Sequence, residues 1–287
     1  MIRSTLLAAT VLAAAFAQHA NAKSYNFKTI KDGKGLNTSM HGINDSGVGV
    51  GGVFDQGSTE RPCFVLTGKV KTPLNDPKGV NGTECWGISS TGTIVGDYFD
   101  ANTNQVGYIY SNGTFTDIMP PKATATVVYG VNASNVVTGY YITKSGEQIG
   151  FLYDGTTYTD IKIKGGSTTE GFGINDSGDY TVSTVLSDGY THSYLVHNGT
   201  MTEIIFPKMV QVAAHQLTNK GLVVATVISA KNVYYAGVFD SKKQTYVKVA
   251  DPDGTTTIGD GINDQHEIAG RFIDSSNNSY GYIATGK

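Results

Sequence analysis

The chain has 287 residues and a formal net charge of −3, and charged side chains make up only 16% of it. It contains no basic stripe, so its composition argues against nucleic acid as a partner. Glycine, asparagine, threonine and tyrosine are plentiful, and this mixture of turn formers and strand formers favours an all-β fold.

The first 22 residues have the features of an export signal. Arg3 precedes an apolar run over residues 6–17, which is short for a membrane span. Ala20-Asn21-Ala22 matches the A-x-A pattern of a cleavage site. No later apolar run is long enough for a membrane helix. We therefore expect a signal peptide over residues 1–22 and a secreted protein, extracellular or periplasmic, whose residues 23–287 form a single domain.

A six-residue motif of the Gly-Ile-Asn type recurs along the mature chain. Its copies begin at Gly42, Gly87, Gly130, Gly173, Gln216 and Gly261. Successive copies start 45, 43, 43, 43 and 45 residues apart, and the fifth copy matches the motif only weakly. A repeat of about 43 residues is the length of a four-stranded propeller blade.

The third repeat shows the predicted strands most clearly. They are expected at residues 127–132, 136–142, 149–153 and 157–161. Short turns separate them, and Asp154-Gly155 is a strong hairpin signal between the last two. Each repeat is therefore predicted to form a meandering antiparallel sheet.

The two ends of the chain predict how the ring closes. The sixth repeat stops after its third strand, near Ala284, whereas residues 26–30 supply a spare strand. Ile30 lies 12 residues before Gly42, and the fourth strand lies 12 residues before the next motif in four other repeats. We therefore expect a closed six-bladed β-propeller whose last blade is completed by the N-terminal strand. An open array would leave that strand unpaired and would need polar capping repeats.

The repeat pattern also resembles a known family. The third strands Gly107-Tyr108-Ile109-Tyr110 and Gly150-Phe151-Leu152-Tyr153 alternate with the Gly-Ile-Asn motifs. This alternation resembles the bacterial extracellular HAF-repeat family, named after a His-Ala-Phe signature, over essentially the whole mature chain. The resemblance implies a secreted repeat protein and assigns no activity to it.

One position departs from the pattern in two repeats. The glycine nine places after the motif start is replaced by Val182 and Ala225 in the fourth and fifth repeats. These two blades are expected to be the least regular. The other four repeats keep this glycine, as Gly51, Gly96, Gly139 and Gly270.

The two cysteines, Cys63 and Cys85, are candidates for a disulfide. Export usually leads to an oxidising compartment, where the two thiols could pair. Two separate buried thiols are the alternative.

The residue before each motif is the candidate site. In a closed ring these six positions would lie near the entrance of the central channel, with an aromatic arc on one side and a polar arc on the other. Aromatic rings can stack on sugars, and His and Asp can hydrogen-bond a ligand. The alternative is packing between blades, because these residues share strand parity with the buried Ile or Val two places later. The six candidates are His41, Trp86, Tyr129, Phe172, His215 and Asp260.

The sequence indicates binding more than catalysis. It contains no G-x-S-x-G, H-E-x-x-H or phosphate-binding loop. We expect a monomeric, non-enzymatic binding module without a cofactor or metal site, which recognises carbohydrate, another extracellular polymer or a surface protein. One alternative is an extracellular hydrolase or lyase that acts on a polysaccharide at the channel mouth, with acids drawn from Glu84, Glu170 and Asp260. A structural role in a matrix is a further alternative.

Overall fold

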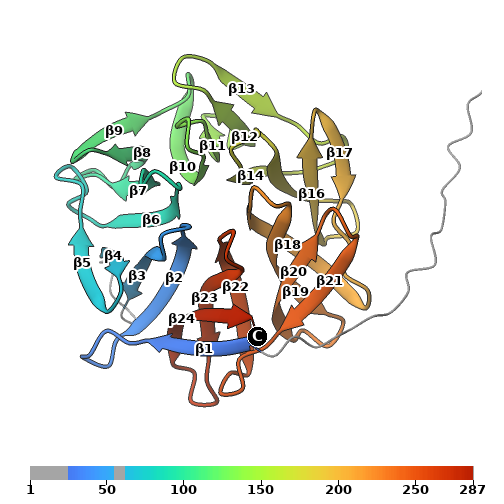
Figure 1. Cartoon of the computed structure of the whole chain (residues 1–287). Helices are drawn as coiled ribbons and strands as arrows, with labels where there is room; N and C mark the ends of the chain where they lie inside the picture. Colours follow the sequence, from blue (N-terminus) through green and yellow to red (C-terminus); the bar gives the residue numbers. More distant parts are fainter. Residues whose placement is uncertain (1–24, 55–61, 287) are drawn as a thin grey trace, which may run out of the picture.

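The structure is a computed structural model that describes residues 25–54 and 62–286. The chain forms six four-stranded antiparallel sheets, arranged as blades around a central axis (Figure 1). The predicted all-β, six-bladed propeller is confirmed. The predicted signal peptide lies outside the described residues, and within them no helix is long and apolar enough to cross a membrane.

In blades 1 to 5 the strands run from the axis outwards in chain order. Blade 1 contains β2 (Asn37–Ile43), β3 (Val48–Phe54), β4 (Cys63–Thr67) and β5 (Val70–Leu74), and blade 2 contains β6 (Thr83–Ile88), β7 (Ile94–Phe99), β8 (Gln105–Ser111) and β9 (Thr114–Ile118). Blade 3 contains β10 (Ala123–Val131), β11 (Val137–Thr143), β12 (Gln148–Tyr153) and β13 (Tyr158–Ile161), and blade 4 contains β14 (Thr169–Ile174), β15 (Tyr180–Val185), β16 (Thr191–His197) and β17 (Thr200–Glu203). Blade 5 contains β18 (Met209–Leu217), β19 (Leu222–Ser229), β20 (Tyr234–Asp240) and β21 (Thr245–Val249).

The sixth blade is closed by the start of the chain, as predicted. It consists of β22 (Thr256–Ile262), β23 (Glu267–Ile273) and β24 (Ser279–Gly286), with β1 (Tyr25–Ile30) as its outer strand. β1 pairs along its whole length with β24 in an antiparallel register that sets Phe27 opposite Ala284. The Phe27 ring packs edge-on against Tyr282, with centroids 5.1 Å apart. Figure 1 shows β1 and β24 side by side, so the ring has no open end.

The glycine of the second strand allows two strands to approach closely. A Cβ on Gly139 would lie 2.0 Å from the carbonyl oxygen of Val127, far inside contact distance. In blades 4 and 5, where Val182 and Ala225 replace this glycine, the ladder skips a pair. The β14–β15 ladder passes from Gly171↔Val182 directly to Ile174↔Tyr180, and β18–β19 shows the same gap. The bulge therefore interrupts the innermost ladder more widely in these two blades than in the other four, in line with the expectation.

The asparagines of the motif join neighbouring blades. The Oδ1 of Asn44 accepts hydrogen bonds from Ser46 N and Val48 N, which is the turn role expected from the sequence. Its Nδ2 donates to the carbonyl oxygen of Ser89 in blade 2 at 3.2 Å. Asn263 closes the ring by donating to the Asn44 carbonyl oxygen at 3.0 Å. One amide therefore serves both a turn and a contact between blades.

The predicted disulfide is confirmed. It joins Cys63 in β4 to Cys85 in β6, with 5.5 Å between the Cα atoms, and thus connects blade 1 to the innermost strand of blade 2. Both residues are buried at 1% exposure.

Breaking this bond should destabilise the ring. Because the bond closes a loop with a sequence separation of 22, the double variant Cys63→Ser/Cys85→Ser is expected to lose about 3 kcal/mol of unfolding free energy. Urea denaturation followed by circular dichroism would measure this loss. As a control, the double variant should unfold at the same urea concentration with and without reductant, because it has no disulfide to reduce. A wild-type midpoint that reductant does not move would contradict the prediction.

Candidate functional site

The structure brings all six predicted site residues together around one cavity. The cavity has a volume of about 210 Å³ and lies on the propeller axis. We call it the channel cup. Its lining consists of the six candidates and one residue that the sequence analysis did not select: His41, Trp86, Tyr129, Phe172, His215, Gln216 and Asp260.

A β-bulge in each innermost strand aims these side chains at the axis. In β2 the pairing passes from Met40↔Gly51 to Gly42↔Val50, which leaves His41 as the extra residue. Trp86 is the extra residue of β6 in the same way. A bulge re-aims a side chain and interrupts the alternation of a strand. The bulge gives the two residues different surroundings, since Ile43 is buried between blades whereas His41 lines the cup and also packs its ring on Trp86 of blade 2.

From blade 1 to blade 5, each cup residue contacts the cup residue of the next blade through its ring. The two flat stacks in this arc are His41 on Trp86 and Tyr129 on Phe172, with interplanar angles of 24° and 21°. Edge-on contacts connect the stacks, and such geometry suits the quadrupoles of aromatic rings. The ring centroids are 4.5 Å apart for His41–Trp86, 5.3 Å for Trp86–Tyr129, 4.6 Å for Tyr129–Phe172 and 4.9 Å for Phe172–His215.

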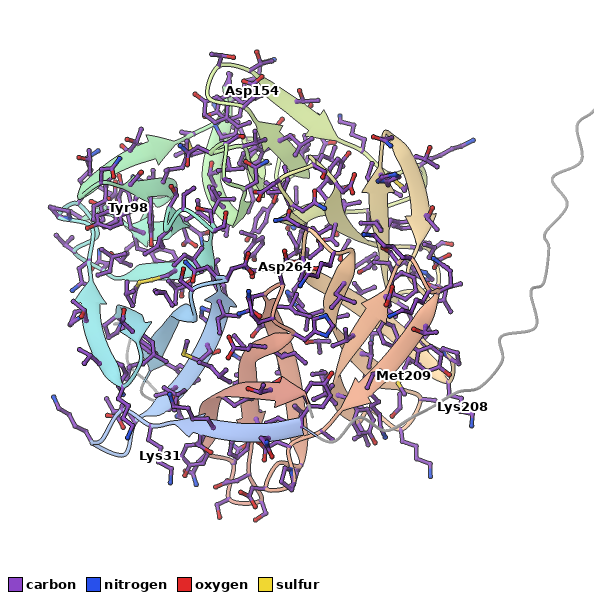
Figure 2. All side chains as sticks on the ribbon, viewed as in Figure 1. Lys31, Tyr98, Asp154, Lys208, Met209 and Asp264 are labelled. Atoms are coloured by element: carbon purple, nitrogen blue, oxygen red, sulfur yellow. A yellow bond between two sulfur atoms is a disulfide. The ribbon has the colours of Figure 1, made fainter. Side chains whose placement is uncertain are left out.

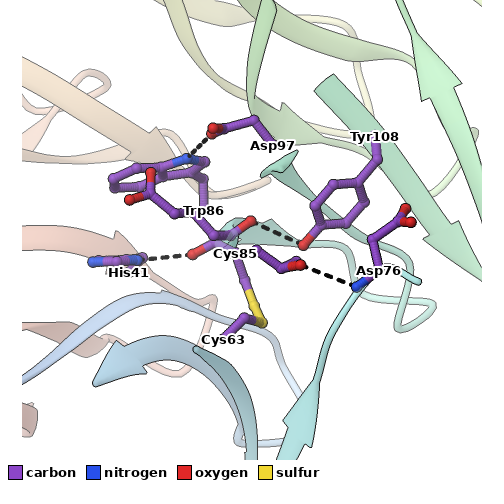
Figure 3. The surroundings of a disulfide bond; sticks show 9 residues. His41, Cys63, Asp76, Cys85, Trp86, Asp97 and Tyr108 are labelled. Carbon is purple, nitrogen blue, oxygen red and sulfur yellow. Dashed lines mark hydrogen bonds between the residues drawn. A yellow bond between two sulfur atoms is a disulfide. The ribbon is translucent and has the colours of Figure 1, made fainter. Parts of the chain in front are cut away.

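Trp86 is fixed by hydrogen bonds next to the disulfide (Figure 3). Its Nε1 donates to Asp97 Oδ1 at 2.7 Å. The preceding residue is Cys85, whose carbonyl oxygen lies 2.8 Å from His41 Nδ1. Because a carbonyl can only accept, Nδ1 carries the proton and the Nε2 of the neutral His41 ring is an acceptor. The disulfide thus anchors the strand that sets both rings.

The two cup histidines are neutral at neutral pH. Burial lowers the pKa of His41 and of His215, and the carboxylate of Asp260 opposes this shift only in part. The charge of Arg271 lowers both pKa values further. The acidic side chain among the described residues of the lining is that of Asp260.

Mild acid should weaken the fold through these histidines. Because their folded pKa values lie below 6.5, the unfolded chain binds more protons once the pH falls below that value. The unfolding free energy should decrease by up to about 1.4 kcal/mol per pH unit for each histidine, between about pH 6.5 and the folded pKa. Urea denaturation across this range measures the slope, and the variant His41→Gln/His215→Gln should flatten it.

His192 should stabilise the fold on acidification, which is opposite to the effect of the two cup histidines, so the experiment needs a control. Hydrogen bonds to Glu203 and Asp188 raise its pKa, so its contribution is full below 6.5 and is lost as the pH rises through the folded value. The comparison should therefore be made in a His192→Gln background. An unfolding free energy that stays constant or increases on acidification in that background would contradict the prediction.

Gln216 is the functional residue that sequence reasoning missed. It stands where the other five motifs have glycine. Its side chain crosses the channel from blade 5 and its Nε2 lies 3.4 Å from the Trp86 carbonyl oxygen in blade 2, on the opposite side of the ring. The motif glycines leave room for it, because Cβ atoms on Gly42 and Gly87 would lie 3.3 and 3.4 Å from this nitrogen. The weakness of the fifth motif was the available signal.

Gln216 also separates two cavities. A smaller cavity of about 60 Å³ lies on its other side and is lined by the Asn/Asp turns of the motifs. Gln216 lines both cavities, so it forms the floor of the cup.

Replacing Gln216 with glycine should open this floor. Because Trp86 is the only tryptophan of the chain, acrylamide quenching of its fluorescence reports access to the cup. The quenching constant should roughly double in Gln216→Gly, because the quencher then enters from two ends. Gln216→Met keeps the bulk and should behave like the wild type. Equal quenching in the glycine variant and the wild type would show that Gln216 is no barrier.

The turn carboxylates at the other end of the channel have a structural role. Asp264 lies near the axis (Figure 2), and its backbone N donates to Asp45 Oδ1 in blade 1 at 2.8 Å. Asp176 Oδ1 accepts from Ala133 N in blade 3 at 2.8 Å. In the described part of the chain, no three His, Cys, Asp or Glu side chains gather to hold a metal ion.

Two other groups of residues do not line the cup. Glu84 and Glu170, the acids named for a hydrolase, are not among the described residues that line the cup. The described loops between second and third strands also contribute no residue to the lining. The cup is built from the innermost strands instead.

Comparisons with known proteins support the fold. No family model and no curated protein matches the chain, so the HAF-repeat resemblance stays a prediction. The chain is similar to a structure assigned as TolB from Agrobacterium tumefaciens, with a TM-score of 0.59, 11% identity and coverage of 88% of this chain and 91% of that one. A mutant Aleuria aurantia lectin in complex with Fucα1-6GlcNAc gives a TM-score of 0.54 at 10% identity, covering 87% and 93%. AofleA from Arthrobotrys oligospora gives 0.53 at 11% identity, covering 91% and 86%. At such identities the likeness shows the fold alone, which is the six-bladed β-propeller.

Proposed function

We propose that this protein is a non-enzymatic binding module that holds one sugar unit of an extracellular glycan in the channel cup. The observation that carries the proposal is the cup itself, about 210 Å³ in volume and lined mainly by aromatic rings with a few polar groups. Ligand sites commonly combine a concave, mostly apolar wall with a small number of polar groups. The stacked and edge-on rings offer a face to a sugar, and Asp260, His41 and Gln216 offer polar atoms.

One site per chain follows from the loss of repeat symmetry. The six cup positions carry five different residue types, so the lining has no repeated pocket. The structure of the Aleuria aurantia lectin, which has the same fold, contains Fucα1-6GlcNAc. Carbohydrates are therefore the first class of ligand to test. The buried disulfide supports a secreted or periplasmic location, because such bonds persist in oxidising compartments.

Calorimetric titration after a glycan array tests the proposal. The array selects a sugar, and titration with that sugar should give one site per chain. Tyr129→Ala removes a ring of the cup and should weaken binding by more than about tenfold. Tyr153→Ala in the same blade is the matched control, because its ring stacks on Tyr158 in the blade's outer strands and is absent from the cup lining.

Two results would overturn the proposal. The first is a sugar affinity that Tyr129→Ala leaves unchanged, which would place the ligand outside the cup. The second is release of reducing ends from the selected glycan by the wild type, abolished in a His41/His215/Asp260 triple alanine variant, which would make the protein a hydrolase.

A further inference from the structure

The cup carries a negative charge that its own lining does not balance. Asp260 contributes a carboxylate to the lining, whereas His41 and His215 are held neutral by burial. The nearest approach of Asp260 Oδ1 to His215 Nε2 is 3.7 Å, which is beyond hydrogen-bond distance. Among the described residues, no lysine or arginine lines the cavity.

More carboxylates lie behind the aromatic wall. Asp97 is fully buried and accepts the Nε1 hydrogen bond of Trp86. Glu84 and Glu170 stand two residues before Trp86 and Phe172 on the innermost strands.

These carboxylates act electrostatically on Tyr129 in the cup. After burial, the charges of Glu170, Asp97 and Glu84 all raise the pKa of Tyr129. Burial also raises the pKa of Glu170, whose Oε1 accepts from Gln148 Nε2.

Arg271 is a cation near the cup. Arg271 of β23 lies close enough to lower the pKa of both cup histidines. Among the described residues that line the cup, Asp260 is the one carboxylate and no lysine or arginine joins it, so the lining favours a cation over an anion.

The position of the rings adds to this preference. Trp86, Tyr129 and Phe172 come from blades 2, 3 and 4, whereas Asp260 comes from blade 6, across the axis from Tyr129. An ammonium group between aromatic faces and a carboxylate is attracted by the ring quadrupoles and by the opposite charge. A neutral ligand gains neither contribution, and an acidic ligand is repelled.

We propose that the cup selects a ligand that carries a protonated amine, in the first instance an amino sugar unit of the glycan. This inference rests on the proposed function and specifies its ligand. Asp260 and the rings of blades 2 to 4 are the selecting groups.

Calorimetric titration with four probes tests the preference. Glucosamine at a pH where its amine is protonated should bind about tenfold more tightly than N-acetylglucosamine, and glucuronic acid should bind most weakly. Choline is the fourth probe, because it carries the charge without a sugar. The Asp260→Asn variant should bring glucosamine and N-acetylglucosamine within about twofold of each other.

The matched control removes the same charge far from the axis. Asp154 lies at the periphery of blade 3 (Figure 2), and the Asp154→Asn variant should keep the wild-type preference. Thermal unfolding of both variants checks that the fold is retained. If Asp260→Asn destabilises the fold, Asp260→Glu is tested as a second variant. It retains a carboxyl group and should keep the wild-type preference for glucosamine.

The outcomes separate this inference from the proposed function. Equal binding of glucosamine and N-acetylglucosamine, unaffected by Asp260→Asn, overturns the inference and leaves the sugar-binding function in place. Binding of choline without any sugar overturns the carbohydrate function and supports the cationic preference. Binding of none of the four probes overturns the cationic preference.

Discussion

A chain that starts at residue 31 should lose the cooperative unfolding transition of the full protein. Removing β1 exposes the whole edge of β24, with which it pairs over six residues. It also removes Ile30, which is buried, and the Phe27 ring that packs on Tyr282. Loss of the Ile30 side chain alone should cost about 2–5 kcal/mol of unfolding free energy. Thermal and urea denaturation followed by circular dichroism would detect the change.

A permuted chain is the control for this truncation. Residues 25–30 would be moved to follow residue 287 through a short Asn-Gly turn, which is a favoured hairpin connection. Because Tyr25 pairs with Gly286, the moved segment would form an ordinary hairpin like that of the other blades. This chain should recover the wild-type transition. A truncated chain with an unchanged midpoint would show that the ring does not depend on β1.

Replacing Trp86 with alanine should give the largest loss of binding at the cup. The change removes the ring that stacks on His41 and contacts Tyr129, so sugar affinity should fall by at least about 30-fold. It also deprives the buried Asp97 carboxylate of the Nε1 donor. Large aromatic-to-alanine changes cost about 3–5 kcal/mol of stability, so titration should be accompanied by urea denaturation.

Trp86→Phe distinguishes the two effects. It keeps an aromatic face and removes the donor, so affinity should stay within about fivefold of the wild type. Its unfolding free energy should fall by about 1.5–3 kcal/mol, the cost of losing a hydrogen bond to a charged group. A folded Trp86→Ala variant with wild-type affinity would exclude the cup as the binding site.

The spacing of the motifs made the fold predictable from the sequence. The distance from Ile30 to Gly42 matched that of other fourth strands, and the structure pairs β1 with β24 accordingly. The cup residues were also predictable, because a closed ring brings equivalent repeat positions together. Their orientation was less certain, since strict alternation assigned His41 and Ile43 to one face. The bulge that separates them inserts one residue and carries no obvious sequence signature.

The contacts across the ring were not predictable. Gln216 reaches the Trp86 carbonyl oxygen from 130 positions away in the chain. A local pattern records only that a glycine is missing, and not where the longer side chain extends. The contact of Asn44 with the Ser89 carbonyl oxygen was hidden for a similar reason, because its turn role already accounted for the residue.

Fluorescence of Trp86 tests the central claim most directly, because the chain has one tryptophan and it lines the cup. Titration with glucosamine should change the emission in a saturable way, with the dissociation constant that calorimetry gives and protection from acrylamide in the bound state. The change should disappear in Tyr129→Ala and persist in Tyr153→Ala. Glucosamine that binds by calorimetry and leaves the emission and quenching of Trp86 unchanged would place the ligand elsewhere and contradict the account.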